Sequence, residues 1–172
     1  GVISPSNNTL PDTPIYLPGT PVKKSVYPVG TFGSLSAQSA LEVSSNIYMM
    51  QLALREGKAK YVPNQEIHIS PDIFTKMRGY FNQFGLGQKT GIDLPGETKG
   101  IEGPTLTAEG NTASGSALDL SYGNYDAYTL IQLAQYISTI ANGGNRMKPY
   151  LVDSIQQTGT DGNLGKLESK TS

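Results

Sequence analysis

Three consecutive polar residues, Ser44-Ser45-Asn46, are the first candidates for chemistry in this sequence. Serine and asparagine prefer caps and turns to helix interiors, because their side chains compete for backbone hydrogen bonds. The plain interpretation is therefore a cap between two helices. The chemical interpretation is a tight turn that aims a hydroxyl and an amide into one cleft. There the hydroxyl would pass a proton to a leaving amine, and the amide would hold a substrate amide in register.

A second candidate, Lys89-Thr90-Gly91, spells a box that serine acyl transferases carry on an edge strand. Here Ile92-Asp93-Leu94-Pro95 follows it, where those enzymes have small residues. The run around it is rich in glycine, so we interpret the tripeptide as a loop rather than as a substrate-binding strand. The nucleophile of such enzymes lies in Ser-x-x-Lys. No serine in this chain has a lysine three positions later.

Composition excludes several other kinds of site. The chain has 172 residues, no Cys and one His, so thiol catalysis is excluded and a histidine triad or zinc site is disfavoured. His68, between two isoleucines, is interpreted as a structural or surface residue. A net charge of −1 argues against nucleic-acid binding, and no apolar run reaches the length of a membrane span. Tyr122, Tyr125 and Tyr128 are assigned mainly to packing, although tyrosines also contact sugars and peptides.

Apolar residues at helical spacing predict the elements that must position the Ser44-Ser45-Asn46 turn. Helices are predicted over residues 36–43, over 46–55 with a stop at Gly57, from Ser70 to Phe81 with Pro71 in first position, and over 130–141. Thr129 and Gln132 form a predicted capping box for the last helix. Its predicted buried stripe comprises Leu130, Leu133, Ala134, Ile137, Ile140 and Ala141.

The rest of the chain is predicted to be mostly irregular. The 20 Gly and 11 Pro exceed average usage and are frequent in residues 1–34 and 84–104, which are predicted to be loops. A strand is predicted at residues 150–152. The polar tail from Thr158 is predicted to be poorly ordered.

Taken together, these blocks resemble the transpeptidase domain of class B penicillin-binding proteins, in order and in spacing. The resemblance rests on Ala40 to Met49 around the S-x-N segment, on Phe84 to Glu97, on Ser121 to Tyr125, and on Gln132 to Pro149. The Asn-Tyr pair after Gly123 is most similar to the 2B type of Gram-positive bacteria.

This resemblance implies a mixed α/β (α+β) fold of the β-lactamase/transpeptidase type, with this chain carrying mainly the helical subdomain, loops and a few short strands. Residues 1–155 would be a partial transpeptidase domain that starts after S-x-x-K and ends before the active-site K-T-G strand. Residues 156–172 would be a polar tail. Apolar helix faces are then expected to lie partly exposed in this chain, because strands of the domain are absent from it.

The resemblance also implies an activity and its residues. The parent protein would be a D,D-transpeptidase that cross-links cell-wall stem peptides and is acylated by penicillin, with no metal or cofactor. Ser44 would relay a proton between the lysine of the nucleophile and the leaving group, and Asn46 would bind the substrate carbonyl. Without nucleophile and K-T-G strand, the chain alone is predicted to be inactive.

Implied partners are stem peptides ending in D-Ala-D-Ala, β-lactams, other cell-wall synthesis proteins and the remainder of the domain, but no nucleic acid. The implied location is the extracytoplasmic face of the membrane, with an anchoring helix outside these residues. Alternatives are a β-lactam sensor or silent homologue of the same fold, a non-catalytic extracellular module that binds peptide or glycan, and a scaffold domain.

Overall fold

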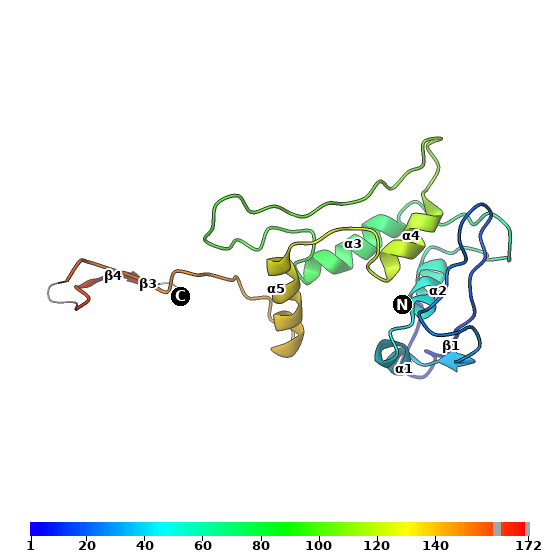
Figure 1. The fold of residues 1–172 in the computed structure, drawn as a ribbon, viewed down its shortest axis with the longest axis horizontal. Coiled ribbons are helices and arrows are strands. Elements are labelled where there is room, and N and C mark those ends of the chain that lie inside the picture. The colour runs from blue at the N-terminus through cyan, green and yellow to red at the C-terminus, as the bar shows by residue number, and fades with distance from the viewer. Residues whose placement is uncertain (160–162, 171–172) are drawn as a thin grey trace. The chain divides into compact units, whose positions relative to one another are not determined.

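The computed structural model describes residues 1–159 and 163–170, and divides the chain into two compact units. The first unit comprises Gly1–Gly79 and Glu102–Asp126, and the second comprises Tyr80–Ile101 and Ala127–Ser172. Figure 1 follows the elements along the chain. The predicted fold class is confirmed, since helices dominate and the described strands are short.

In the first unit, the two-residue strands β1 (Leu10–Pro11) and β2 (Ser34–Leu35) pair antiparallel. The helices α1 (Ala37–Glu42), α2 (Asn46–Glu56) and α4 (Ser114–Ser121) lie in this unit, where α2 packs against α4 and β1 (Figure 1). These elements and the loops beside them supply most of the largest buried apolar side chains, namely Leu10, Ile15, Ile47, Tyr48, Met50, Leu118 and Leu120, and the segment after Pro71 supplies Ile73 and Phe74. The predicted loop of residues 1–34 therefore contributes to the core around α2, while keeping little regular structure.

The helix predicted from Ser70 begins later: α3 spans Ile73–Gln83 and continues from the first unit into the second. The Ile73 N–H donates to the Ser70 carbonyl (3.1 Å), which closes a turn before the helix. The first helical bond then runs from the Lys76 N–H to the Asp72 carbonyl (2.9 Å). The Ser70 hydroxyl donates to the Asp72 carboxylate instead of capping the helix. Pro71 therefore lies in a turn before α3 and not at the first helical position.

A buried ion pair joins two segments of the first unit. Arg78 donates from Nε and Nη2 to Asp126 (2.9 and 2.7 Å), whose side chain is 1% exposed. The Gly103 N–H also donates to Asp126, and the Arg78 guanidinium lies 5.3 Å from the centre of the Phe74 ring. These contacts fix the end of the first segment against residues 102–126.

In the second unit, α5 (Leu130–Ala141) starts at the predicted capping box of Thr129 and Gln132 and ends at Asn142, as the sequence predicts. Its predicted buried stripe is wrong. Leu130, Ile137 and Ile140 are 86%, 60% and 53% exposed, and Gln132, Gln135 and Thr139 are the buried side chains.

Loop backbone covers the polar side of α5 and explains this inversion. Gln132 donates to the carbonyls of Gln88 (2.7 Å) and Lys99 (3.0 Å), and Gln135 donates to that of Met147 (2.8 Å). Gly85, at φ +94°, allows the closest approach, because a Cβ there would lie 2.2 Å from the Gln135 Oε1. The expectation that apolar helix faces lie partly exposed is thus confirmed for α5.

The strand predicted at residues 150–152 is also wrong. The N–H groups of Leu151 and Val152 donate to the Asp93 carboxylate (2.8 Å each), so a side chain takes the place of a partner strand. Strand β3 (Ser154–Gln156) follows and pairs antiparallel with β4 (Leu167–Lys170), which lies in the tail predicted to be poorly ordered from Thr158. Residues 160–162 and 171–172 of that predicted tail lie outside the described residues.

Candidate functional site

The Ser44-Ser45-Asn46 segment forms the turn between α1 and α2. Helix α1 ends at Glu42, and Ser45 is the N-cap of α2, with its Oγ accepting from the Tyr48 N–H (3.0 Å). The cap interpretation is therefore confirmed for Ser45. Ser44 adopts the left-handed region at φ 52°, which costs a non-glycine residue about 1–3 kcal/mol. Such a conformation persists only where its neighbours hold it, and it is common at functional turns.

The three side chains of this turn have different surroundings. Ser45 is 2% exposed, whereas Ser44 is exposed and Asn46 is half-buried. Ser44 and Asn46 line a hollow of about 250 Å³ in the first unit. The other lining residues are Ala40, Leu41, Ser45, Met49, Ser121 and Tyr122. A hydroxyl and a carboxamide two positions apart therefore border the same small cavity, as the chemical interpretation requires.

The inward-pointing Ser45 belongs to a buried polar cluster. Its hydroxyl donates to Asp12 Oδ1 (2.6 Å) and lies 3.3 Å from the Ser25 Oγ. Ser25 also donates to Asp12 Oδ1 (3.3 Å), and its Oγ accepts from the Ile47 N–H (3.3 Å). Sequence reasoning missed Asp12 and Ser25, because they lie in a segment predicted only as a loop.

A second polar group borders the same hollow from α4 and the residues after it. Tyr122 donates its hydroxyl to Asp119 Oδ1 (3.0 Å) and accepts from the Asn124 amide (3.2 Å). Lys23 forms an ion pair with the same Asp119 oxygen (2.6 Å). Burial, with a further contribution from Asp119, raises the pKa of the Tyr122 phenol.

The tyrosine cluster thus divides. Tyr122 lines the hollow, while Tyr125 packs near Phe74, with ring centres 6.1 Å apart, and donates to the Pro104 carbonyl (2.7 Å). The predicted packing role therefore fits Tyr125 well and Tyr122 only in part. The block from Ser121 to Tyr125, which resembles a family motif, was the signal that could have linked Tyr122 to the turn.

Lys89-Thr90-Gly91 is a loop, as the sequence predicts. The Glu97 carboxylate accepts from the Thr90 N–H (2.5 Å), the Thr90 hydroxyl (2.6 Å) and the Gly91 N–H (3.0 Å). The Thr90 hydroxyl contributes most to lowering the pKa of Glu97 below its ordinary value of 4.5. Because its polar groups bind Glu97 within the loop, this tripeptide is structural in the second unit.

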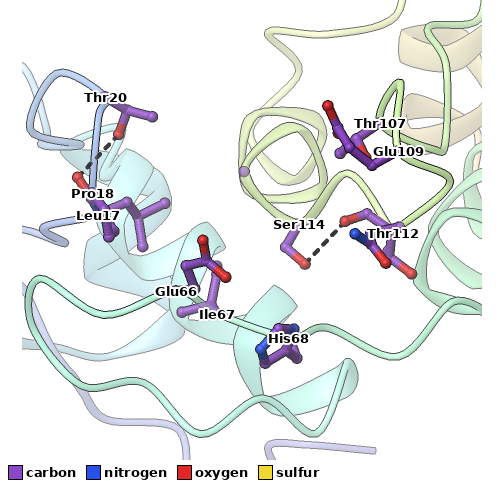
Figure 2. Close-up of a pocket in the computed structure, with 12 residues that line it drawn as sticks. Leu17, Pro18, Thr20, Glu66, Ile67, His68, Thr107, Glu109, Thr112 and Ser114 are labelled. Atoms are coloured by element: carbon purple, nitrogen blue, oxygen red, sulfur yellow. Dashed lines mark hydrogen bonds between the residues drawn. The ribbon is translucent and has the colours of Figure 1, made fainter.

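A larger hollow of about 410 Å³ lies elsewhere in the first unit (Figure 2). It shares no lining residue with the hollow at Ser44. His68 is exposed on its wall, beside Glu66 and Ile67, and Thr107, Glu109 and Ser114 lie across from them (Figure 2). Across residues 1–159 and 163–170, no group of three or more His, Cys, Asp and Glu residues is placed to hold a metal ion. The histidine thus takes the surface position predicted for it.

Comparison with known proteins identifies the family of this chain. Residues 1–172 match the family described as "Penicillin binding protein transpeptidase domain". The chain is 42% identical over 159 residues to penicillin-binding protein 2A of Bacillus subtilis, covering 92% of this chain and 21% of that protein. It is 39% identical over 171 residues to penicillin-binding protein 2B of Streptococcus pneumoniae, covering 97% and 24%.

Two further matches are a solved structure and a relative named as a transpeptidase. The solved structure of penicillin-binding protein 2B from S. pneumoniae strain R6 superposes with a TM-score of 0.81 at 37% identity, covering 99% of this chain and 27% of that one. Peptidoglycan D,D-transpeptidase MrdA of Acinetobacter baumannii is 34% identical over 83 residues, covering 45% of this chain and 12% of that protein.

The chain therefore spans about a quarter, or less, of the length of these relatives. In the part of the chain that the structure describes, no helix is long and apolar enough to cross a membrane. The match over every residue, together with the two close Gram-positive relatives, shows that this chain belongs to the transpeptidase-domain family of class B penicillin-binding proteins, close to the 2B type.

Proposed function

We propose that this chain is the part of a peptidoglycan D,D-transpeptidase domain that contributes the S-x-N turn to the active site. One observation carries the proposal: Ser44 and Asn46 border a common hollow with at least part of each residue exposed, while Ser45 between them is buried and donates its hydroxyl to Asp12. A simple helix cap would need only Ser45. The strained backbone at Ser44 is a further sign that Ser44 and Asn46 are held in place for chemistry.

The proposed step is an acyl transfer. A serine outside this chain attacks the carbonyl of the penultimate D-Ala, and the bond from that carbonyl to the nitrogen of the terminal D-Ala breaks. Ser44 donates its hydroxyl proton to the leaving nitrogen and receives one from the lysine that activates the nucleophile. Asn46 donates from its carboxamide to a substrate amide carbonyl and fixes the substrate's register.

The complete enzyme would need parts that this chain does not carry. Its Ser-x-x-Lys nucleophile and its Lys-Thr/Ser-Gly strand would come from the remainder of the domain. The exposed stripe of α5, including Leu130 and Ile137, favours a covering layer supplied by that remainder. Stem peptides ending in D-Ala-D-Ala would be its substrates, β-lactams would acylate the same serine, and other cell-wall synthesis proteins would be its partners on the extracytoplasmic side of the membrane.

The test uses labelled penicillin, followed by denaturing electrophoresis. We expect a covalent band on the product of the complete reading frame that encodes this chain, and none on the 172 residues alone. Ser44→Ala in the complete protein should slow acylation by about 100-fold or more, the usual contribution of a proton-transfer group. Ser138→Ala, at an exposed position on α5, is the matched control and should leave the rate unchanged.

Two outcomes would contradict the proposal. A covalent band on the isolated chain would place a nucleophile within it. An unchanged acylation rate in the Ser44→Ala protein would remove the proton-relay role and favour the plain cap. A complete protein that is acylated but cross-links no peptides would instead be a sensor of the same fold.

A further inference from the structure

We propose that Asp12 is a positioning residue for the S-x-N turn and acts through the buried hydroxyl of Ser45. The inference rests on the proposed function, because it concerns the geometry of Ser44 and Asn46 during acyl transfer. The family resemblance treats Ser45 as the variable middle position of the motif. In this chain Ser45 is instead the most buried residue of the turn.

The hydrogen bonds around Asp12 have a defined direction. Its Oδ1 accepts the hydroxyl protons of Ser45 (2.6 Å) and Ser25 (3.3 Å). A hydroxyl has one proton and two lone pairs, so each serine is left with its oxygen free to accept. The Ser45 oxygen accepts from the Tyr48 N–H and the Ser25 oxygen from the Ile47 N–H. One carboxylate thus orients both hydroxyls that satisfy the first turn of α2.

The helix end itself favours this arrangement. The first N–H groups of an α-helix have no partner within the helix, and a negative charge near them is stabilising. Asp12 follows β1 directly, and its own N–H donates to the Gly33 carbonyl beside β2 (3.3 Å). The β1–β2 pair therefore holds the carboxylate, and the carboxylate holds the start of α2.

The turn gains its geometry from this anchor. Ser44 precedes Ser45 in a strained backbone conformation, and Asn46 follows it as the first residue of α2. Because Ser45 is hydrogen-bonded to Asp12, the side chains of Ser44 and Asn46 that border the hollow are confined to one relative placement. Without the Asp12 carboxylate, the Ser45 and Ser25 hydroxyls lose their shared acceptor, and the strained turn loses a neighbour that stabilises it. We expect the chemical step to slow more than penicillin binding weakens.

The experiment is a double-mutant cycle in the complete protein, with Asp12→Asn, Ser45→Ala and both together. Acylation by labelled penicillin is followed at several concentrations, which separates the affinity of the first complex from the rate of acylation. Asparagine keeps the shape of the aspartate, so the fold is retained. We expect the acylation rate to fall about tenfold in each single variant, with affinity nearly unchanged, because Asp12→Asn replaces a charged acceptor by a weaker neutral amide oxygen and Ser45→Ala removes the donor.

The double variant should lose less than the product of the two single effects, because both changes weaken or remove the same Asp12–Ser45 bond. Asp153→Ala, which removes an exposed carboxylate, is the matched control and should not change either constant. Additive losses, or an Asp12→Asn protein as fast as the control, would overturn the inference. If the unchanged protein is not acylated at all, the proposed function fails instead, so the two failures are distinguishable.

Discussion

Helices α2 and α5 are of nearly equal length, yet they bury opposite kinds of side chain. Helix α2, in the first unit, buries Ile47, Met50 and Leu54, and its cap is tied to Asp12. Helix α5, in the second unit, buries two glutamines and a threonine and exposes its apolar stripe. A hydrophobic stripe therefore identifies a helix, but it does not say whether the residues that cover the stripe belong to the same chain.

The largest expected effect that tests this contrast concerns the first unit, where α2 buries apolar side chains. Asp126→Ala would leave the Arg78 guanidinium buried without its carboxylate, since that carboxylate is 1% exposed. We expect the free energy of unfolding to fall by about 3–5 kcal/mol. Urea denaturation followed by circular dichroism measures it. Glu102→Ala is the control, because its exposed carboxylate lies 3.6 Å from Arg78 Nη1 and should contribute less than about 1 kcal/mol.

A smaller expected effect tests α5 in the second unit, the helix that buries its polar side. Gln132→Ala removes the donor for the Gln88 and Lys99 carbonyls and should cost about 1–3 kcal/mol. Ile137→Ala, at a position 60% exposed, should cost about 0.5 kcal/mol or less in this chain. The same isoleucine change should cost about 2–4 kcal/mol in the complete protein if the remainder of the domain covers the stripe. Equal costs in both proteins would contradict that covering layer.

The smallest effect concerns the loop of residues 89–97. Because the pKa of Glu97 is lowered, its ionised carboxylate stabilises the loop at pH values above the ordinary pKa of 4.5. This contribution is lost as the pH falls through the lowered pKa, when the carboxylate takes up a proton. At acid pH, hydrogen exchange at the Thr90 and Gly91 amides should therefore be faster than the intrinsic pH dependence of amide exchange predicts. Glu97→Gln should remove that additional pH dependence, and a wild-type profile in this variant would exclude Glu97 as its cause.

Local signals explain what could be predicted from the sequence. The turn at Ser44-Ser45-Asn46 and the capping box at Thr129 follow from side chains that bond to nearby backbone, and the stop at Gly57 follows from the poor helix propensity of glycine. Helix α4 was missed, because its N-cap is Ala113 and no side chain caps it. Ser70 and Pro71 gave a start signal two residues too early, because their preferences suit a turn as well as a helix.

Contacts across long stretches of chain could not be predicted in this way. The bond between Asp12 and Ser45 joins residues 33 apart, and the pair of Arg78 and Asp126 joins residues 48 apart. No local propensity encodes such a pairing, because it depends on how the loops of the first unit return to α2. For the same reason, Tyr122 could be recognised as part of a motif, while its place beside Ser44 came only from the fold.

The backbone at Ser44 also restricts which amino acids can serve at this position. Threonine carries the same hydroxyl, but its branched Cβ is a poor fit at φ 52°. Glycine and asparagine accept that conformation readily, but neither has a hydroxyl. Among the hydroxyl-bearing aliphatic side chains, the turn therefore admits serine far more readily than threonine, and the backbone conformation alone sets this preference.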